Sequence, residues 1–197
     1  MIAGLVLAAG ASSRLRGPVP KQLLELDGRP LVQHAVDAAA GAGLEPVVVV
    51  VGHLGDRVEE AISLPAGGRV VSNPEYRSGQ AGSLKAGLAA LPDEADAAVI
   101  LLGDQPGVES GTIRLVVGEF LRTGTPIVQA RYGDGPGHPV LLGREVWPLL
   151  ESLTGDRGAR DVIAAHPELR TEVTVAGPAP RDVDTTEEYE GLREPDK

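Results

Sequence analysis

The sequence predicts one α/β domain built on a doubly wound, mostly parallel sheet. Short runs rich in Val, Ile, Leu and Ala alternate along the 197 residues with stretches of helical periodicity. The runs Val47 to Val51 and Ala97 to Leu102 are apolar throughout, as expected for parallel strands that helices cover on both faces. A chain of this length suits one domain, and no linker or repeat divides it. We therefore expect a domain over residues 1–193, followed by a tail at 194–197.

The individual elements follow from apolar runs and from residues that begin or end helices. The expected strands are Ile2 to Leu7, Val47 to Val51, Arg69 to Ser72, Ala97 to Leu102, Pro126 to Ala130 and Glu172 to Val175. The helix expected from Pro30 to Ala42 has proline at its start and Gly43 after its end. Further helices are expected at Asp56 to Ile62, Ser83 to Leu91 with Ser83 as N-cap, Ser110 to Arg122, Arg144 to Leu153, Arg157 to Ala165 and Thr186 to Leu192. Ligands of such sheets lie beyond the carboxyl ends of the strands, so the residues after each strand are the candidates for chemistry.

The composition excludes several classes of protein. The chain has no cysteine, so disulfides, thiol nucleophiles and cysteine zinc sites are excluded. Its formal net charge of −10 makes it a poor non-specific binder of nucleic acid. No apolar run approaches the roughly 18 residues of a membrane span, and no basic segment precedes the first apolar run. We expect a cytoplasmic protein that binds neither nucleic acid nor membrane.

The loop after the first expected strand is a candidate anion site. Leu7-Ala8-Ala9-Gly10 brings small residues that let the backbone approach a ligand. Arg14, Arg16 and Lys21 add three positive charges within eight residues, and both residue types bind phosphate. The spacing matches neither a Walker A loop nor a dinucleotide-binding fingerprint. The alternative is a surface turn whose basic side chains are solvated.

Acidic residues follow the strand from Ala97 to Leu102 and recur near the C-terminus. Asp104 emerges just after the strand, where a carboxylate can hold a divalent cation whose coordination waters and phosphate oxygens complete. The alternative is that Asp104 caps the following turn. Asp182 and Asp184 share one side of an extended segment, so one of them could reach the same metal. The local pattern before Glu187 favours a helix N-cap instead.

Two polar, glycine-containing segments complete the candidates. The segment from Asn73 to Ser83 offers side chains and N–H groups that could contact a base, although alone it is typical of an ordinary loop. The segment from Gly133 to Pro139 is typical of a glycine-rich turn and contains His138. A lone histidine is more often structural than catalytic, and the four histidines show no metal-ligand spacing.

Taken together, the motifs resemble those of the molybdenum cofactor nucleotidyltransferases, specifically the molybdopterin cytidylyltransferase branch. The resemblance covers nearly the whole chain and rests on five motifs in the same order. They are Leu7-Ala8-Ala9-Gly10-x-Ser12-x-Arg14 with Lys21-Gln22-Leu23-Leu24, Gly103-Asp104-Gln105-Pro106, Gly137-His138-Pro139-Val140, Thr154 to Arg160, and Asp182-Val183-Asp184-Thr185. The loop between Arg14 and Lys21 is about two residues longer than in the family, which leaves Arg14, Arg16 or both as phosphate ligands.

The resemblance implies a fold of the nucleotide-diphospho-sugar transferase type and a role for each residue of the site. The nucleoside triphosphate would contact Leu7, Ala8, Ala9, Gly10, Arg14, Lys21, Gly79, Gly82 and Ser83. The catalytic residues would be Arg14, Lys21 and Asp104. Asp104 and Asp184 would bind Mg²⁺, and His138 and Arg157 would face the acceptor. Ala9 is similar to the branch that uses CTP, since the guanylyl branch tends to have glycine there.

The implied activity is Mg²⁺-dependent transfer of CMP from CTP to the phosphate of molybdopterin or molybdenum cofactor, with release of pyrophosphate. Alternatives are transfer from GTP, or another acceptor such as a sugar-1-phosphate, a methylerythritol phosphate or a phospholactate, because fold does not settle substrate. Alternatives of other classes are a non-catalytic maturation protein that hands cofactor to a molybdenum enzyme, and a metal-dependent glycosyltransferase that uses Asp182. The presence of Lys21, Asp104 and Asp184 argues against the non-catalytic alternative.

Overall fold

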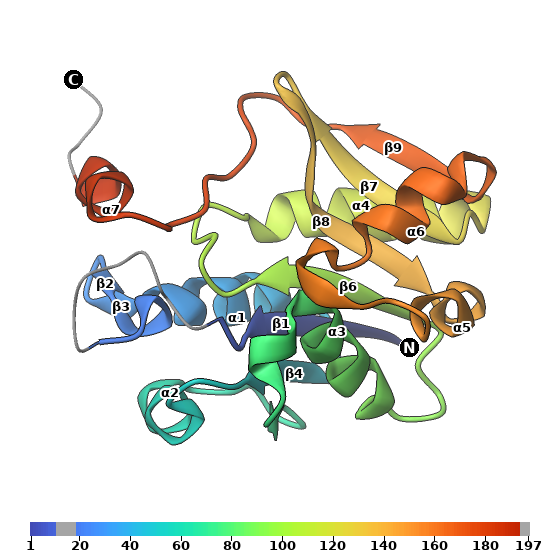
Figure 1. Cartoon of the computed structure of the whole chain (residues 1–197). Coiled ribbons are helices and arrows are strands. Elements are labelled where there is room, and N and C mark those ends of the chain that lie inside the picture. The colour runs from blue at the N-terminus through green and yellow to red at the C-terminus, as the bar shows by residue number, and fades with distance from the viewer. Residues whose placement is uncertain (11–18, 194–197) are drawn as a thin grey trace.

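A seven-stranded sheet forms the centre of the protein (Figure 1). The structure, a computed structural model, describes residues 1–10 and 19–193, so the tail expected at 194–197 lies outside the described residues. The strand order is β5-β4-β1-β6-β8-β7-β9, and β8 alone among these strands runs antiparallel to its neighbours. The bounds are β1 Ile2–Ala8, β4 Val47–Val51, β5 Arg69–Ser72, β6 Ala97–Leu102, β7 Ile127–Tyr132, β8 Gly135–Gly143 and β9 Arg170–Thr174. The expected mostly parallel sheet is confirmed.

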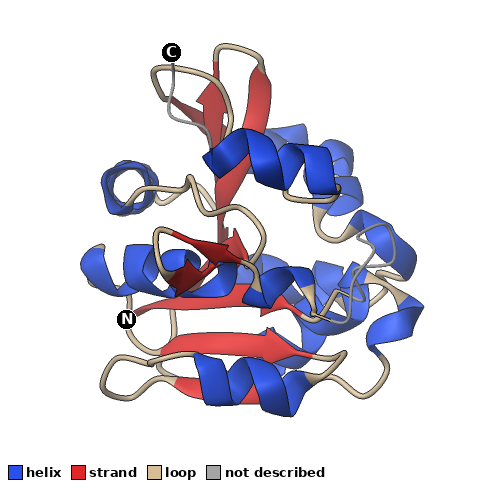
Figure 2. Ribbon diagram, turned by 90° about the vertical axis from the view of Figure 1, so that its left-hand side faces the viewer, coloured by secondary structure: helices blue, strands red, loops and turns tan. Residues whose placement is uncertain are grey.

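Helices cover both faces of the sheet (Figures 1 and 2). They are α1 Leu31–Gly41, α2 Gly55–Ala61, α3 Gln80–Ala89, α4 Ser110–Thr123, α5 Trp147–Leu150, α6 Arg160–Ala165 and α7 Thr186–Arg193. In β4, Val47, Val49 and Val51 pack on one face with residues of α1 and α4. The alternate residues Val48 and Val50 pack on the other face with residues of α3 and α6, because successive side chains of a strand point to opposite faces. No helix among the described residues is long and apolar enough to cross a membrane.

The sequence prediction is wrong for the segment from Gly133 to Pro139, which it treats as a turn throughout. Only its beginning turns: β8 starts at Gly135 and pairs with β7 as a hairpin. Within β8, a Cβ at Gly137 would lie 3.2 Å from Cε2 of Tyr132, so glycine lets this ring cover the strand. The glycines and prolines that suggest a turn therefore belong to a strand against which another chain segment packs closely.

Three helix boundaries also differ from expectation. The region from Arg144 to Leu153 is divided into a 3-10 turn, η3 Arg144–Val146, and the short α5. Proline has no N–H and fits only the first helical turn, so Pro148 fixes the start of α5. Gly158 has φ 54°, which delays α6 until Arg160. Helix α3 begins at Gln80, directly after Gly79 with φ 113°, so the expected N-cap Ser83 lies inside the helix.

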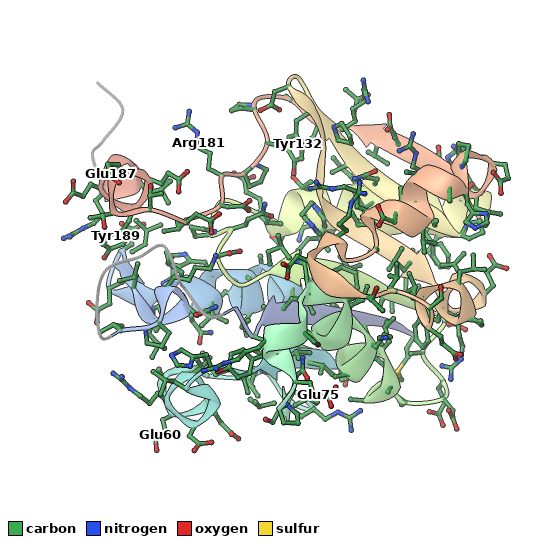
Figure 3. The ribbon with its side chains drawn as sticks, in the orientation of Figure 1. Glu60, Glu75, Tyr132, Arg181, Glu187 and Tyr189 are labelled. Carbon is green, nitrogen blue, oxygen red and sulfur yellow. The ribbon has the colours of Figure 1, made fainter. Side chains whose placement is uncertain are left out.

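A small hairpin, unexpected from the sequence, lies beside the C-terminal helix. It consists of β2 Glu25–Leu26 and β3 Arg29–Pro30. Its turn residues Asp27 and Gly28 have φ 52° and 74°, as a tight hairpin turn requires. The hydroxyl of Tyr189 on α7 donates to the backbone oxygen of Glu25 at 2.6 Å, and Figure 3 shows Tyr189 on the hairpin side of α7. The C-terminal helix is thus attached to the N-terminal part of the chain.

The carboxyl ends of β1, β4 and β6 meet at one edge of the sheet, where the antiparallel β8 begins. Two glycines let the segments after these strands approach one another. A Cβ at Gly52 would lie 2.8 Å from the backbone oxygen of Ala9, and one at Gly103 would lie 3.1 Å from Cβ of Ala8. This is the edge at which parallel sheets bind their ligands.

The packing of α3 on the sheet predicts that Gly87→Ala destabilises the protein. The new Cβ would lie 2.3 Å from Cδ1 of Leu5 and 2.9 Å from Cγ2 of Val50, both buried in the core. We expect a loss of about 1–3 kcal/mol in the free energy of unfolding, measured by denaturant titration. Gly118→Ala, on the exposed face of α4 with nothing near its Cβ, is the control and should stabilise by up to about 1 kcal/mol. Equal stability of the two variants would contradict this packing.

Candidate active site

Lys21, Asp104 and Asp184 meet at the carboxyl edge of the sheet. Lys21, only 9% exposed, belongs to the 3-10 turn η1 Lys21–Leu23 that follows the first loop. Its Nζ forms ion pairs with Oδ2 of Asp104, which follows β6, and with Oδ1 of Asp184 at 2.7 Å. Three residues that are remote in the sequence therefore share one ion-pair network, and two of them were predicted as metal ligands.

The carboxylates of Asp104 and Asp184 stabilise the positive charge of Lys21. Burial by itself lowers the pKa of Lys21, but the ion pairs with Asp104 and Asp184 outweigh it and raise the pKa above its ordinary 10.5. The lysine therefore stays protonated at neutral pH. One ammonium group thus faces two carboxylates, which favour its charged form.

The segment before α7 resolves the competition between capping and cation binding. Thr185 Oγ1 accepts from the Glu188 N–H at 3.2 Å, and Glu188 Oε2 accepts from the N–H groups of Asp184 and Thr185 at 2.8 Å each. This reciprocal capping box satisfies the helix N-terminus without either aspartate side chain. The N-cap signal in the sequence is real, but Thr185 supplies it and the Asp184 side chain pairs with Lys21.

A polar cavity of about 660 Å³ surrounds these charges. Of the residues predicted to bind the nucleotide, it is lined by Leu7, Ala9, Gly10, Lys21, Gly79 and Ser83. Ala8 is instead buried in the core, and Gly82 lines a different cavity together with residues such as Asn73 and Lys85. Arg14 and Arg16 lie outside the described residues.

The polar cavity also contains residues to which the sequence analysis gave no individual role, although all except His53 lie in motifs or segments that it named. These are Gln22, His53, Tyr76, Arg77, Gln80 and Asp156. Tyr76 links two of them, since its hydroxyl lies 3.3 Å from Nδ1 of His53 and accepts from Nε of Arg77 at 3.2 Å. His53 is the second residue after the all-valine strand β4, so its position at the carboxyl edge could be predicted from the sequence.

A second cavity of about 320 Å³ adjoins the polar one, because Leu7 and Gln80 line both. We call it the arginine cavity: its lining includes Arg157, Arg160 and Arg170, and among the described residues no carboxylate side chain contributes to it. Apolar side chains such as Ile100 form much of the remainder. The two residues predicted for the acceptor side, His138 and Arg157, both lie here.

Two close contacts, one between backbones and one between a glycine and a side chain, hold the two sides of the site together. A Cβ at Gly79 would lie 2.2 Å from the carbonyl carbon of Gly155, and one at Gly158 would lie 2.5 Å from Oε1 of Gln80. The loop before α3 thus packs directly on the turn η4 Gly155–Arg157, and glycine is required at the contact. This contact positions Gln80 between the two cavities.

His138 lies in the arginine cavity as a neutral group. Its Nδ1 is 3.2 Å from the backbone oxygen of Ile100, which assigns the ring proton to Nδ1. Burial lowers the pKa of the imidazole below its ordinary 6.5, although the Ile100 bond and the charges of Asp182 and Asp104 oppose this change. The ring is therefore held by the fold and also lines a cavity, so the structural and functional interpretations of this histidine are compatible.

The described residues contain no cluster of three or more Asp, Glu or His side chains arranged to hold a metal. Asp104 and Asp184 offer two carboxylates that already share one cation. Two carboxylates suit Mg²⁺, which keeps several waters and takes phosphate oxygens from its substrate as further ligands. The donor set therefore fits a substrate-assisted metal site better than a closed protein cage.

Residues 4–170 match the model of the MobA-like NTP transferase domain. The chain belongs to this family. It is therefore a nucleotidyltransferase, and the family and enzyme class predicted from the motifs are confirmed. The crystal structure of Rv0371c from Mycobacterium tuberculosis H37Rv is similar at 35% identity and a TM-score of 0.84, covering 97% of this chain and 96% of that chain. A structure of Rv0371c in complex with manganese has a TM-score of 0.82 at 33% identity, covering 98% and 97% of the two chains.

Two curated relatives carry different names. The nicotine blue oxidoreductase of Paenarthrobacter nicotinovorans is 35% identical over 197 residues, which is 95% of this chain and 94% of that protein. The bifunctional protein GlmU of Kineococcus radiotolerans is 36% identical over 141 residues, which is 70% of this chain and 29% of GlmU. The chain thus spans less than a third of the length of that GlmU.

The environment of His138 gives a pH prediction. Because its folded pKa lies below 6.5, the unfolded chain takes up this proton at a higher pH than the folded protein does. The free energy of unfolding should therefore fall as the pH drops from above 6.5 through the folded pKa. NMR titration of the ring protons should give a midpoint below 6.5, and His138→Gln should lose stability less steeply on acidification. A midpoint at or above 6.5 would show that the ring is not desolvated.

Proposed function

We propose that this nucleotidyltransferase transfers CMP from CTP to the phosphate of molybdopterin or molybdenum cofactor, with release of pyrophosphate. The observation that carries the proposal is the junction of two unlike cavities. The polar cavity holds Lys21, Asp104 and Asp184, as an NTP site requires, and it opens onto the arginine cavity. A triphosphate and a phosphorylated acceptor could approach one another from the two sides, near Leu7 and Gln80.

The reaction needs no activated side-chain nucleophile. A phosphate monoester has its second pKa near 6, so it is largely a dianion at neutral pH. One of its oxygens attacks the α-phosphorus of the NTP in line; the new P–O bond forms as the bond to the bridging oxygen of the β-phosphate breaks, and pyrophosphate leaves. Such transfers depend chiefly on positioning and on charge stabilisation.

The principal barrier is repulsion between two polyanions. Like unit charges about 4 Å apart repel by about 4 kcal/mol at an effective dielectric constant of 20. Lys21 supplies one fixed positive charge, and Asp104 and Asp184 are the residues that would hold Mg²⁺. When bound there, the metal supplies charge neutralisation at the phosphates. The manganese complex of Rv0371c supports a divalent cation in this family.

The acceptor and the base rest on motif resemblance together with the cavity. Arg157, Arg160 and Arg170 give the arginine cavity a positive lining in a protein of net charge −10, which suits an anionic acceptor. The residues His138 and Arg157 belong to motifs typical of the molybdopterin branch. Ala9 lines the polar cavity and supports CTP over GTP. A molybdenum enzyme that receives the product would be the natural protein partner.

Pyrophosphate release tests the proposal directly. Purified protein is incubated with Mg²⁺, molybdenum-loaded molybdopterin and each NTP in turn, and we expect release with CTP alone. Release with GTP alone would show that the nucleotide is GTP and not CTP. Release only with another phosphorylated acceptor would show that molybdopterin is not the acceptor. Reduction or oxidation of nicotine blue without any pyrophosphate release would instead favour the activity named for the Paenarthrobacter relative.

From the ion-pair network we expect substitutions of Asp104 and Lys21 to impair catalysis in different ways. Asp104→Ala should reduce turnover by at least about 100-fold, because a metal contact contributes several kcal/mol, yet the protein should fold because Lys21 keeps Asp184. Lys21→Ala should lower kcat/KM for the NTP by a factor that corresponds to a loss of about 2–4 kcal/mol in transition-state stabilisation. Asp93→Asn, which changes a fully exposed acid beside Arg144, is the control and should leave the kinetics unchanged. Metal-dependent turnover that survives Asp104→Ala would rule out the metal assignment.

A further inference from the structure

We propose that Gln105 is a positioning residue whose amide holds Asp182 and thereby fixes Asp184 beside Asp104. The inference rests on the metal role given above to Asp104 and Asp184. It concerns how Asp104 and Asp184, which lie far apart in the sequence, are held close to each other. Neither the sequence motifs nor the family match explains this.

The first observation is a buried side-chain bond next to the acid pair. Gln105 is 7% exposed, and its Nε2 donates to Oδ1 of Asp182 at 2.5 Å across 77 residues of sequence. The bond begins one residue after Asp104 and ends two residues before Asp184. The bond gives the buried Nε2 group a partner, without which it would cost about 1–3 kcal/mol, whereas Oε1 of the same amide is buried and has no partner among the described residues.

The second observation is a backbone bond in the same place. The N–H of Val183 donates to the backbone oxygen of Asp104 at 3.0 Å, and the Val183 side chain is fully buried. Residues 182 and 183 are therefore tied to residues 104 and 105 by one side-chain bond and one backbone bond. We call this pair of bonds the Gln105 brace.

The chain around Asp184 makes such a brace necessary. The residues between the end of β9 at Thr174 and the start of α7 at Thr186 form neither helix nor strand. The sheet therefore does not set the position of Asp184. The Gln105 brace holds the chain just before Asp184, and the capping box of Thr185 and Glu188 holds the chain just after it.

The bonds distinguish Asp182 from the other two acids. Lys21 Nζ pairs with Asp104 and Asp184, whereas Oδ1 of Asp182 accepts from Gln105. Asp182 also lines the polar cavity, so a direct metal contact is the competing interpretation. The two interpretations make opposite predictions for Asp182→Asn, because asparagine keeps an oxygen that can accept from Gln105 but loses the charge of a metal ligand.

Binding of Mn²⁺ to the full-length protein, followed by electron paramagnetic resonance without nucleotide or acceptor, tests the brace. Gln105→Leu should weaken Mn²⁺ binding by about 10-fold or more, as changes behind metal ligands do, and Asp182→Asn should keep it within about threefold. Gln33→Leu is the matched control. Gln33 is also 7% exposed, and it bonds Asp37 and Ser63, none of which lines either cavity, so its loss should lower stability and leave Mn²⁺ affinity unchanged.

Three results would overturn the proposal. Unchanged Mn²⁺ affinity in Gln105→Leu would show that the brace does not position the acids. A loss in Asp182→Asn as large as that in Asp184→Asn would make Asp182 a ligand. A loss of Mn²⁺ affinity in Gln33→Leu equal to that in Gln105→Leu would show that the effect comes from general destabilisation of the protein.

A second readout separates this proposal from the metal assignment. If the unaltered protein binds no Mn²⁺, the metal part of the proposed function fails, and amide hydrogen exchange in the metal-free protein then decides the brace. The Val183 amide should exchange faster in Gln105→Leu than in Gln33→Leu. Equal exchange of that amide in the two variants would overturn the brace itself.

Discussion

The ion-pair network of Lys21, Asp104 and Asp184 is the interaction on which the arrangement of the site depends. It joins the turn after the first loop, the end of β6 and the segment before α7. In a partly buried network, removal of one partner leaves another charge uncompensated, so the three residues constrain one another. Asp104 and Asp184 are also the two carboxylates that we propose as ligands of a divalent cation, so the network that joins these segments lies where that cation would bind.

A second constraint is the separation of charge between the two cavities. The acids lie in the polar cavity, whereas the described lining of the arginine cavity contains arginines and no carboxylate. In a protein of net charge −10, this separation lets anionic ligands approach despite the overall field. The close contacts of Gly79 with Gly155 and of Gly158 with Gln80 keep the cavities adjacent. Nucleotidyl transfer requires such adjacency more than it requires any reactive side chain.

Much of the fold was predictable because its signals are local. The all-valine β4 and the apolar β6 have the pattern expected of buried parallel strands, and that expectation placed Asp104 at the carboxyl edge. The strand β8 was not predictable in the same way, because its glycines and prolines imitate a turn unless the covering ring of Tyr132 is known. Proline and glycine also moved helix boundaries, as Pro148 and Gly158 show.

The site was predictable where one residue had one possible role, and less so where two roles use the same residue types. Aspartate and threonine before a helix serve capping and cation binding alike, so the division between Thr185 and Asp184 depends on the tertiary position of Lys21. Gln80 and Gln105 lie in segments that the sequence analysis named, but nothing in the sequence gave either glutamine a role. Their importance comes from the cavities and the segment that the fold brings beside them.

The most direct test of the central claim is anomalous diffraction at the manganese edge from crystals of the protein grown with Mn²⁺ and a non-hydrolysable CTP analogue. We predict one anomalous peak between the carboxylates of Asp104 and Asp184, with the triphosphate in the polar cavity and Lys21 in contact with it. A peak elsewhere, or a nucleotide bound away from these three residues, would contradict the assignment of this network as the reaction centre.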